Sequence, residues 1–370
     1  MQLTGRHVAI LSYRLGMADG VSVAAAQWAT ALGRLGRQVR TVAGDGRADV
    51  LVPGLALDAP APPSRRELDA ALGDVDLVVV DNVCSLPMNL PVGEAVARYL
   101  AGRPTVLRHH DLPWERARYV DVAWPHDDPA WRHVTINERA RRALARRRGI
   151  TATTVYHGFD ERPCPARRAE VRAALGVGEG LLVLQPTRAV PRKNVHGGLE
   201  LARALGGTYW LTGPAEEGFA DALARTLAAA EVPVRRGLPD GVGMAAAYAA
   251  SDVVVLPSSW EGFGLPLIES ALHRRPLVVG GFPVARELRR LGFRWFTGVD
   301  LGALRGWLAA PDPALLDHNE ELARRHFGMD ALVRRLDLLL SGQPVCHHAG
   351  AAGSGGRERG ERTGCDCLTG

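Results

Sequence analysis

Short apolar segments alternate with helical patterns along most of the chain. The first segment, His7 to Ser12, meets a glycine-containing loop, and a helical pattern from Val21 to Leu35 follows it and ends at Gly36. The alternation continues through Gln38 to Ala43, Leu77 to Asp81, Glu94 to Leu100 and Thr105 to Arg108. Continuous apolar strands separated by helices are typical of buried parallel sheets, so the pattern predicts a doubly wound α/β unit.

A second series of the same kind follows an interruption. Val155 to Asp160 and the Pro-rich residues 162–165 break the pattern, and we expect the hinge between two domains there. The strands predicted beyond this hinge are Leu181 to Gln185, Tyr209 to Thr212, Val232 to Arg235, Val253 to Pro257 and Leu277 to Gly280. The helices predicted between them are Val195 to Leu205, Phe219 to Ala230 and Leu265 to Leu272. Two doubly wound halves are the simplest interpretation.

These features divide the chain into four predicted parts. The first domain covers residues 1–160 and the second covers residues 161–328. An amphipathic stretch at 329–340 predicts a last helix. Residues 341–370 are rich in glycine, mixed in charge and nearly free of large apolar side chains, which predicts disorder.

Composition narrows the class of protein. Of 370 residues, 46% are hydrophobic and 23% are charged, which excludes wholesale disorder and a fibrous architecture. No apolar run reaches the roughly 20 residues that a membrane span needs, and no signal peptide precedes the first predicted strand. The five cysteines are scattered and form no paired framework or zinc-like spacing, which indicates a reducing compartment. We therefore expect a cytoplasmic protein.

The basic residues contain one informative exception. The chain has 45 lysines and arginines against 40 acidic residues, for a formal charge of +5, which suits an anionic ligand without naming one. Lys193 is the single lysine, so all the other basic residues are arginine. Since arginine is the default cation of this sequence, a lysine at one position suggests a reason specific to that site.

The densest candidate site runs from Trp260 to Glu269, between a predicted strand and an apolar helix. Gly262 and Gly264 would allow backbone amides to approach a ligand closely, and the helix start offers unpaired N–H groups to a phosphate. Glu261 and Glu269 flank this loop, and carboxylates accept hydrogen bonds from vicinal hydroxyls. The segment is therefore suited to a phosphorylated sugar.

A second candidate site is the segment Pro186 to Asn194, between a predicted strand and the helix that begins at Val195. Arg188 and Lys193 lie here, at the carboxyl end of a strand, where open α/β sheets bind their ligands. The compact ammonium group of a lysine can deliver a point charge to a leaving phosphate.

Two further loops carry polar groups that suit a ligand. His110 and Asp111 directly follow the predicted strand at Thr105 to Arg108, and such a pair can orient or polarise a hydroxyl. Asp19 and Gly20 stand at the start of the first helix, where an anion could meet backbone amides. The loop lacks G-x-G-x-x-G, which counts against a dinucleotide cofactor.

In this order, the motifs resemble those of the retaining glycosyltransferases of family 4. The resemblance covers Val8 to about Leu340, and it includes the Val-x-His-Gly-x-Asp turn at 155–160. Two positions depart from the pattern: His157 stands where many relatives have Asn, and Asn194 stands where Gly often follows the Lys. The resemblance implies the GT-B fold, in which two Rossmann-like domains face each other across a cleft. It also implies an acceptor on the first domain, a nucleotide-sugar donor on the second, and a last helix that crosses back.

The resemblance also assigns site residues. The catalytic residues that it implies are Arg188, Lys193, Glu261 and His110. The donor-binding residues that it implies are Gly20, Gly262, Phe263, Gly264, Leu265 and Glu269. Acceptors usually bind to first-domain loops, where the candidates are Asp111, Trp114 and Arg116. We expect the arginine and lysine to neutralise the leaving diphosphate, Glu261 to hold sugar hydroxyls and Glu269 to hold the ribose.

The expected reaction needs no cofactor beyond the nucleotide-sugar substrate, which could be a UDP-, GDP- or ADP-sugar. Fixed cations and helix-end amides would stabilise the diphosphate, so we expect no metal requirement. In the same-face substitution attributed to this family, the departing phosphate oxygen takes the acceptor proton, so no general base is expected. The acceptor should be a polar small molecule, a glycan or a glycolipid.

Other functions remain open at this point. A GT-B phosphorylase or a sugar-nucleotide epimerase would share the fold, and free phosphate as the required co-substrate would identify the phosphorylase. The basic segment Arg139 to Arg148 could meet anionic lipid headgroups, or nucleic acid in a protein of another class. We do not expect nucleic-acid binding, because aromatic residues for base stacking are few and acidic residues nearly balance the charge.

Overall fold

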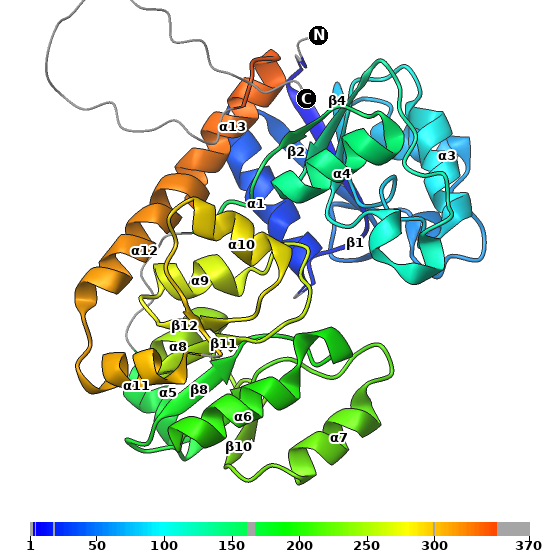
Figure 1. The fold of residues 1–370 in the computed structure, drawn as a ribbon. Helices are drawn as coiled ribbons and strands as arrows, with labels where there is room; N and C mark the ends of the chain where they lie inside the picture. The colour runs from blue at the N-terminus through cyan, green and yellow to red at the C-terminus, as the bar shows by residue number, and fades with distance from the viewer. Residues whose placement is uncertain (1–2, 4, 18, 161–166, 299, 346–370) are drawn as a thin grey trace, which may run out of the picture.

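The computed structural model describes residues 3, 5–17, 19–160, 167–298 and 300–345. It contains two parallel β-sheets, one from each half of the chain, with helices on both faces of each sheet (Figure 1). The expectation of two doubly wound α/β halves is confirmed.

The first sheet has seven strands in the order β3-β2-β1-β4-β5-β6-β7. The strands are β1 (His7–Leu15), β2 (Gln38–Gly46), β3 (Val50–Leu51), β4 (Leu77–Asp81), β5 (Thr105–His109), β6 (Trp131–Thr135) and β7 (Ala152–Thr154). The helices of this half are α1 (Gly20–Arg34), α2 (Arg65–Leu72), α3 (Leu90–Leu100) and α4 (Glu138–Arg148). Every residue of β4 and β5 is buried, as expected for central strands covered on both faces.

The second sheet has six strands in the order β10-β9-β8-β11-β12-β13. The strands are β8 (Leu182–Gln185), β9 (Thr208–Leu211), β10 (Val234–Arg236), β11 (Val253–Leu256), β12 (Leu277–Val279) and β13 (Phe296–Thr297). The helices of this half are α5 (Arg168–Leu175), α6 (Val195–Leu205), α7 (Ala220–Ala228), α8 (Met244–Ala250), α9 (Pro266–Leu272), α10 (Pro283–Arg290), α11 (Leu301–Ala309) and α12 (Pro313–Phe327).

The strand order reverses once in each sheet, between β1 and β4 and between β8 and β11. Ligands of open α/β sheets bind outside the carboxyl ends of the strands at such a point, where adjacent loops diverge. The loops that follow these strands carry the motifs found in the sequence, namely those after β1, β5, β8 and β11. The fold therefore brings segments far apart in the sequence to the edges where ligands bind.

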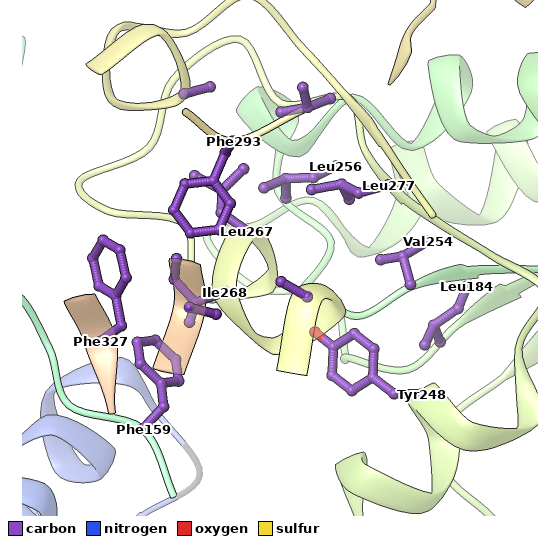
Figure 2. Packing of buried hydrophobic residues seen from close by; sticks show 14 of the residues in the cluster. Phe159, Leu184, Tyr248, Val254, Leu256, Leu267, Ile268, Leu277, Phe293 and Phe327 are labelled. Atoms are coloured by element: carbon purple, nitrogen blue, oxygen red, sulfur yellow. The ribbon is translucent and has the colours of Figure 1, made fainter. Parts of the chain in front are cut away.

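The two halves meet through apolar side chains around the turn at 155–160. Phe159 lies next to the end of this turn, and its amide donates to the carbonyl of Phe327, the last residue of α12, at 2.7 Å. Both rings join a core of the second half that contains Leu267 and Ile268 of α9 (Figure 2). Val155 to Phe159 are all buried, so the segment predicted as a hinge is packed into the boundary between the halves.

The last helix, α13 (Met329–Ser341), lies beside α1 of the first half (Figure 1). Leu332 and Leu336 are fully buried in one cluster with Val8 and Trp28. The carbonyl of Leu340 accepts from the amide of Leu3 at 2.8 Å, so the end of α13 also contacts the chain before β1. Within the segment predicted as disordered, residues 341–345 are described and Val345 packs on the same cluster. Residues 346–370 lie outside the described residues.

Candidate active site

Lys193 and Glu261 lie in contact, although 68 positions separate them in the sequence. Lys193 ends the 3₁₀ turn Pro191–Lys193 after β8, and its Nζ donates to Oε1 of Glu261 at 2.6 Å. The hydroxyl of Ser258 donates to the same oxygen at 2.6 Å. Burial lowers the pKa of Lys193, and the carboxylate of Glu261 opposes this shift. The two densest sequence motifs therefore form one buried charged cluster.

The glycine loop between β11 and α9 leaves amide groups without partners. Gly264 has φ of +88°, a conformation that favours glycine. A Cβ at Gly262 would lie 3.2 Å from the carbonyl oxygen of His110, so the loop lies close against the first half. Within the described structure, the amide N–H groups of Phe263 and Gly264 have no hydrogen-bond acceptor. They are free to bind an anion or a hydroxyl.

His110 comes directly after β5 and faces the second half. Its amide donates to Oδ1 of Asn82 at 3.1 Å, which fixes the backbone at the end of the strand. Its ring stacks on the ring of His157, with 5.6 Å between centroids. His157 in turn meets the Phe263 ring edge-on at 4.8 Å. Contacts thus run without a break from His110 through Gly262 to the buried cluster of Glu261 and Lys193.

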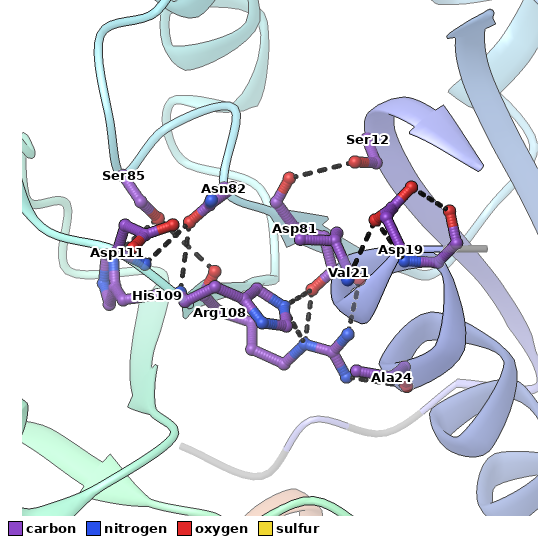
Figure 3. A network of polar contacts seen from close by, with 12 residues as sticks. Ser12, Asp19, Val21, Ala24, Asp81, Asn82, Ser85, Arg108, His109 and Asp111 are labelled. Atoms are coloured by element: carbon purple, nitrogen blue, oxygen red, sulfur yellow. Dashed lines mark hydrogen bonds and ion pairs between the residues drawn. The ribbon is translucent and has the colours of Figure 1, made fainter. Parts of the chain in front are cut away.

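The side chain of His110 contacts a buried ion pair between Asp81 and Arg108. Asp81 ends β4 and Arg108 lies in β5, and both side chains are fully buried (Figure 3). Nη2 of Arg108 donates to Oδ2 of Asp81 at 2.6 Å, and Nε2 of His110 lies 3.3 Å from Oδ1 of Asp81. Arg108 also donates to the carbonyl of Ala24 in α1 at 3.2 Å. The pair therefore links α1 to the ends of β4 and β5.

The sequence patterns did not predict this ion pair. The only signal was a charged residue at or next to the end of each of two otherwise apolar strands, Leu77 to Asp81 and Thr105 to Arg108. Charged residues are almost never fully buried unless they are paired. Two such residues on neighbouring strands could have suggested a pair, but only the strand order shows that β4 and β5 are adjacent.

Gly20 is the first residue of α1, one position before the start of the helical pattern expected from Val21. A Cβ at Gly20 would lie 3.9 Å from Cδ1 of Leu265, so this helix start faces the start of α9 in the second half. The expectation that a ligand anion meets the first amides of α1 needs correction, because Asp19 caps this helix. The carboxylate of Asp19 accepts from the amides of Val21 and Ser22 at 3.0 and 3.1 Å.

Arg188 and Glu269 lie in the second half, but each is bound to a neighbour outside the cluster of Lys193 and Glu261. Arg188 forms an ion pair with Glu216, on the loop after β9. Glu269 lies one turn into α9 and accepts from the hydroxyl of Tyr248 at 2.7 Å. Burial raises the pKa of Glu269. A ligand that binds Arg188 must share it with Glu216 or displace Glu216. A ligand that binds Glu269 must likewise share it with Tyr248 or displace Tyr248.

The predicted acceptor residues divide into two groups. Asp111 and Arg116 lie beside the site: Nη2 of Arg116 is 3.5 Å from Oδ1 of Asp111, and Nη1 is 4.0 Å from Oε1 of Glu217 in the second half. Trp114 instead packs on a small core under α4, with the guanidinium of Arg147 over its ring. The structure does not bring Trp114 together with the other predicted residues.

Helix α4, the basic segment of the sequence, is partly neutralised by two carboxylates. Arg141 and Arg142 form ion pairs with Glu138, and Arg139 forms one with Glu115. Burial raises the pKa of Glu115 to about 7. The helix thus carries less free charge than its six arginines suggest.

Two features are absent from the part of the chain that the structure describes. No cluster of three or more histidine, cysteine, aspartate or glutamate side chains could hold a metal ion there. None of the helices in those ranges has both the length and the apolar character needed to cross a bilayer.

Comparison with known proteins identifies the architecture. The structure superimposes on the Anabaena protein HepE in complex with UDP-glucose with a TM-score of 0.70, covering 91% of this chain and 99% of that one, at 18% identity. The chain has the GT-B fold. WaaG, a glycosyltransferase involved in lipopolysaccharide biosynthesis, superimposes with a TM-score of 0.63 over 90% of this chain and all of that one, at 16% identity.

The sequence relatives of this GT-B chain are glycosyltransferases. Mannosylglucosylglycerate synthase of Thermotoga maritima is 24% identical over 88% of this chain and 97% of its own length. Its counterpart from Petrotoga mobilis is 22% identical over 89% of this chain and 96% of its own length. The serotype-specific mannosyltransferase WbdA of Escherichia coli matches only a segment, with 30% identity over 102 residues. No family model matches the sequence.

Proposed function

We propose that this protein is a retaining, metal-independent glycosyltransferase of the family 4 type, which transfers a hexosyl group from a nucleotide sugar to a polar acceptor. The observation that carries the proposal is the continuous contact among Lys193, Glu261, Gly262 and His110 where the two halves meet. Each comes from a loop at the carboxyl edge of a sheet, and these loops belong to different halves. The cluster combines a cation, a carboxylate and free amides, which a sugar diphosphate requires.

The proposed chemistry depends on charge separation. As the bond between the anomeric carbon and the phosphate oxygen breaks, positive charge builds on the sugar and negative charge builds on the diphosphate. Lys193, Arg188 and the amides of Phe263 and Gly264 stabilise the diphosphate, and preorganised groups of this kind usually provide the largest share of catalysis. Glu261 binds sugar hydroxyls, and His110 contacts the sugar from the first half. Glu269 binds the ribose.

Retention follows from attack on the face that the diphosphate leaves. The acceptor oxygen forms the new bond to the anomeric carbon, and its proton passes to the departing phosphate oxygen, so no protein base is required.

The donor and the acceptor are proposed only as classes. HepE was solved with UDP and glucose and with UDP-glucose, and the names of the sequence relatives include mannosyl transfer. We therefore propose a UDP-, GDP- or ADP-linked hexose as donor. On the acceptor side, Arg116 suits an acidic group, because its nearest carboxylates lie at 3.5 and 4.0 Å and could be displaced.

The first experiment identifies the donor. Purified protein is heated with each nucleotide sugar, and the midpoint of thermal unfolding is measured. A ligand that binds only the folded state raises this midpoint, so the true donor should give a larger shift than the other two. Free phosphate that replaced the nucleotide sugar in turnover would instead support a phosphorylase.

The second experiment removes the two central charges. Lys193→Ala and Glu261→Ala should each lower kcat by at least about a hundredfold, since one preorganised electrostatic contact is commonly worth that much. Arg203→Ala is a matched control, because among the described residues Arg203 pairs only with two exposed glutamates, Glu200 of α6 and Glu231 beyond α7. Circular dichroism verifies that the variants fold. Near-normal turnover in both site variants would refute the mechanism, and inversion of the anomeric centre in the product would refute retention.

A further inference from the structure

Arg192 is a charged residue of the site that the family resemblance did not assign. It precedes Lys193 in the turn after β8, and its side chain is only 23% exposed. Its Nη1 donates to Oε2 of Glu261 at 3.2 Å and to the carbonyl of Trp260 at 3.3 Å. The guanidinium also lies over the Trp260 ring, 5.6 Å from its centroid. Arg192 is thus held beside the glycine loop by three contacts.

The charges around Arg192 do not balance. The loop after β8 carries three cations, Arg188, Arg192 and Lys193. Glu216 pairs with Arg188, whereas Glu261 is shared between the other two, with one oxygen for each. This cluster of described residues therefore keeps one surplus positive charge, and an anion that entered it would be attracted.

Two nitrogens of the Arg192 guanidinium, Nε and Nη2, have no hydrogen-bond partner among the described residues. Nε of Arg192 is buried and, among the described residues, has no hydrogen-bond acceptor. A buried donor that is left unsatisfied loses the hydrogen bonds it made to water and gains none in return. Nη1 is already engaged, whereas Nε and Nη2 have no acceptor among the described residues, so this edge of the guanidinium is left for a ligand oxygen.

We propose that Arg192 is a third cation of the donor site, which offers its Nε–Nη2 edge to the diphosphate oxygens while Nη1 continues to donate to Glu261. This inference rests on the proposed function, because it takes a nucleoside diphosphate group as the ligand. A guanidinium can serve two acceptors at once through its fixed fork of N–H groups, which the ammonium of Lys193 cannot do with the same geometry. Arg192 then couples binding of the leaving group to the position of the carboxylate that binds the sugar.

The test measures binding of nucleoside diphosphates by calorimetry, without turnover. UDP, GDP and ADP are titrated into the wild type, and the one that binds most tightly is used for the variants, with its free nucleoside as the reference ligand. Arg192→Gln removes the charge, and Arg192→Lys keeps the charge but removes the fork. Arg203→Gln is the surface control. Glu261 keeps Lys193 and Ser258 as partners in both site variants, so the loop retains its other contacts.

We expect Arg192→Gln to weaken nucleoside diphosphate binding at least about tenfold, the usual effect of losing a charged hydrogen bond. Arg192→Lys should give a smaller loss, and affinity for the free nucleoside should not change in either variant. Unchanged diphosphate affinity in Arg192→Gln would overturn the inference, as would an equal loss of nucleoside and diphosphate affinity. If the wild type bound none of the three diphosphates, the proposed function itself would fail.

Discussion

His157 shows how burial controls the charge of one side chain in this protein. Its ring is enclosed between His110 and Phe263 at the boundary of the two halves. Burial lowers the pKa of His157 well below its ordinary value, and the nearby His110 and Arg108 act in the same direction. The imidazole therefore stays neutral in the folded protein at pH values where a solvent-exposed histidine binds a proton.

This neutrality predicts a pH-dependent stability. In the unfolded chain His157 titrates near its ordinary pKa of about 6.5. Below that pH the unfolded state binds a proton that the folded state does not bind, so this residue's contribution to stability falls by about 1.4 kcal/mol per pH unit. His157→Asn removes the titration. The wild type should have a higher free energy of unfolding than this variant. The difference should be constant above pH about 7 and should shrink as the pH falls below about 6.

Urea unfolding of both proteins at several pH values between 8 and 5 measures this difference. The comparison cancels the groups that both proteins share, including Glu115 and Glu269, whose raised pKa values act in the opposite direction. A difference that stayed the same across the whole pH range would show that the histidine is not kept neutral.

At the scale of single residues, the sequence predicted those site residues that stand out by residue type and by spacing along the chain. The lone lysine and the glycines at 262 and 264 stood out by type and spacing, and the structure brings Lys193 to the loop that contains these glycines. It could not predict partners set by strand order, such as Asp81 with Arg108. Neither spacing nor composition carries that information.

Helix α4 illustrates how an element of one half is completed by the other. Asn137 caps its start by accepting from the amide of Ala140 at 2.7 Å. Glu287 of α10, in the second half, accepts from the amides of Glu138 and Arg139 at 2.9 and 3.2 Å. A carboxylate at this position also interacts favourably with the positive end of the helix dipole. The start of α4 therefore depends on contact between the halves.

We expect Glu287→Ala to lower stability by about 1–2 kcal/mol, because two helix-end amides lose their acceptor and the hydroxyl of Tyr156 loses the oxygen it binds at 2.7 Å. Glu287→Gln, which keeps an acceptor but loses the charge, should cost less. The midpoint of thermal unfolding measures both. Glu321→Ala is the control, since this exposed residue pairs only with Arg325 one turn along the same helix. Equal midpoints for the control and Glu287→Ala would contradict the prediction.

The elements that the sequence predicted are those with continuous apolar runs. The expected segments at Leu77 to Asp81 and Val195 to Leu205 match β4 and α6 residue for residue. The strand Trp131–Thr135 was missed, because arginine and histidine interrupt its apolar pattern. In the structure His133 is buried in that strand, where it is held by His109 at 2.9 Å and by Asp127 at 3.0 Å. Tertiary hydrogen bonds compensate there for a weak local pattern.

At the scale of the whole molecule, the last helix packs against the first elements of the chain. Helix α12 lies against α9 of the second half, and α13 continues from it to pack beside α1 of the first half (Figure 1). The core that covers one face of the first sheet thus includes side chains from both ends of the sequence, such as Val8 and Leu336. Removing an apolar side chain from α13 should therefore lower the stability of the first half, although α13 follows the second half in the sequence.

The variant Leu336→Ala tests this directly. Leu336 is fully buried, and a leucine-to-alanine change in a packed core costs about 2–5 kcal/mol. Native-state hydrogen exchange locates the loss: amides of β1 and α1 should exchange faster than in the wild type, while those of β8 and β11 change little, because local opening follows the packing of each unit. Leu304→Ala is the matched control, since this buried leucine belongs to a core that contains Val183 of β8 and Val253 of β11. In Leu304→Ala, amides of β8 and β11 should exchange faster than in the wild type, while those of β1 and α1 change little. If both variants accelerated exchange equally in the two sheets, the halves would unfold as one unit, and α13 would stabilise the whole molecule rather than the half it contacts.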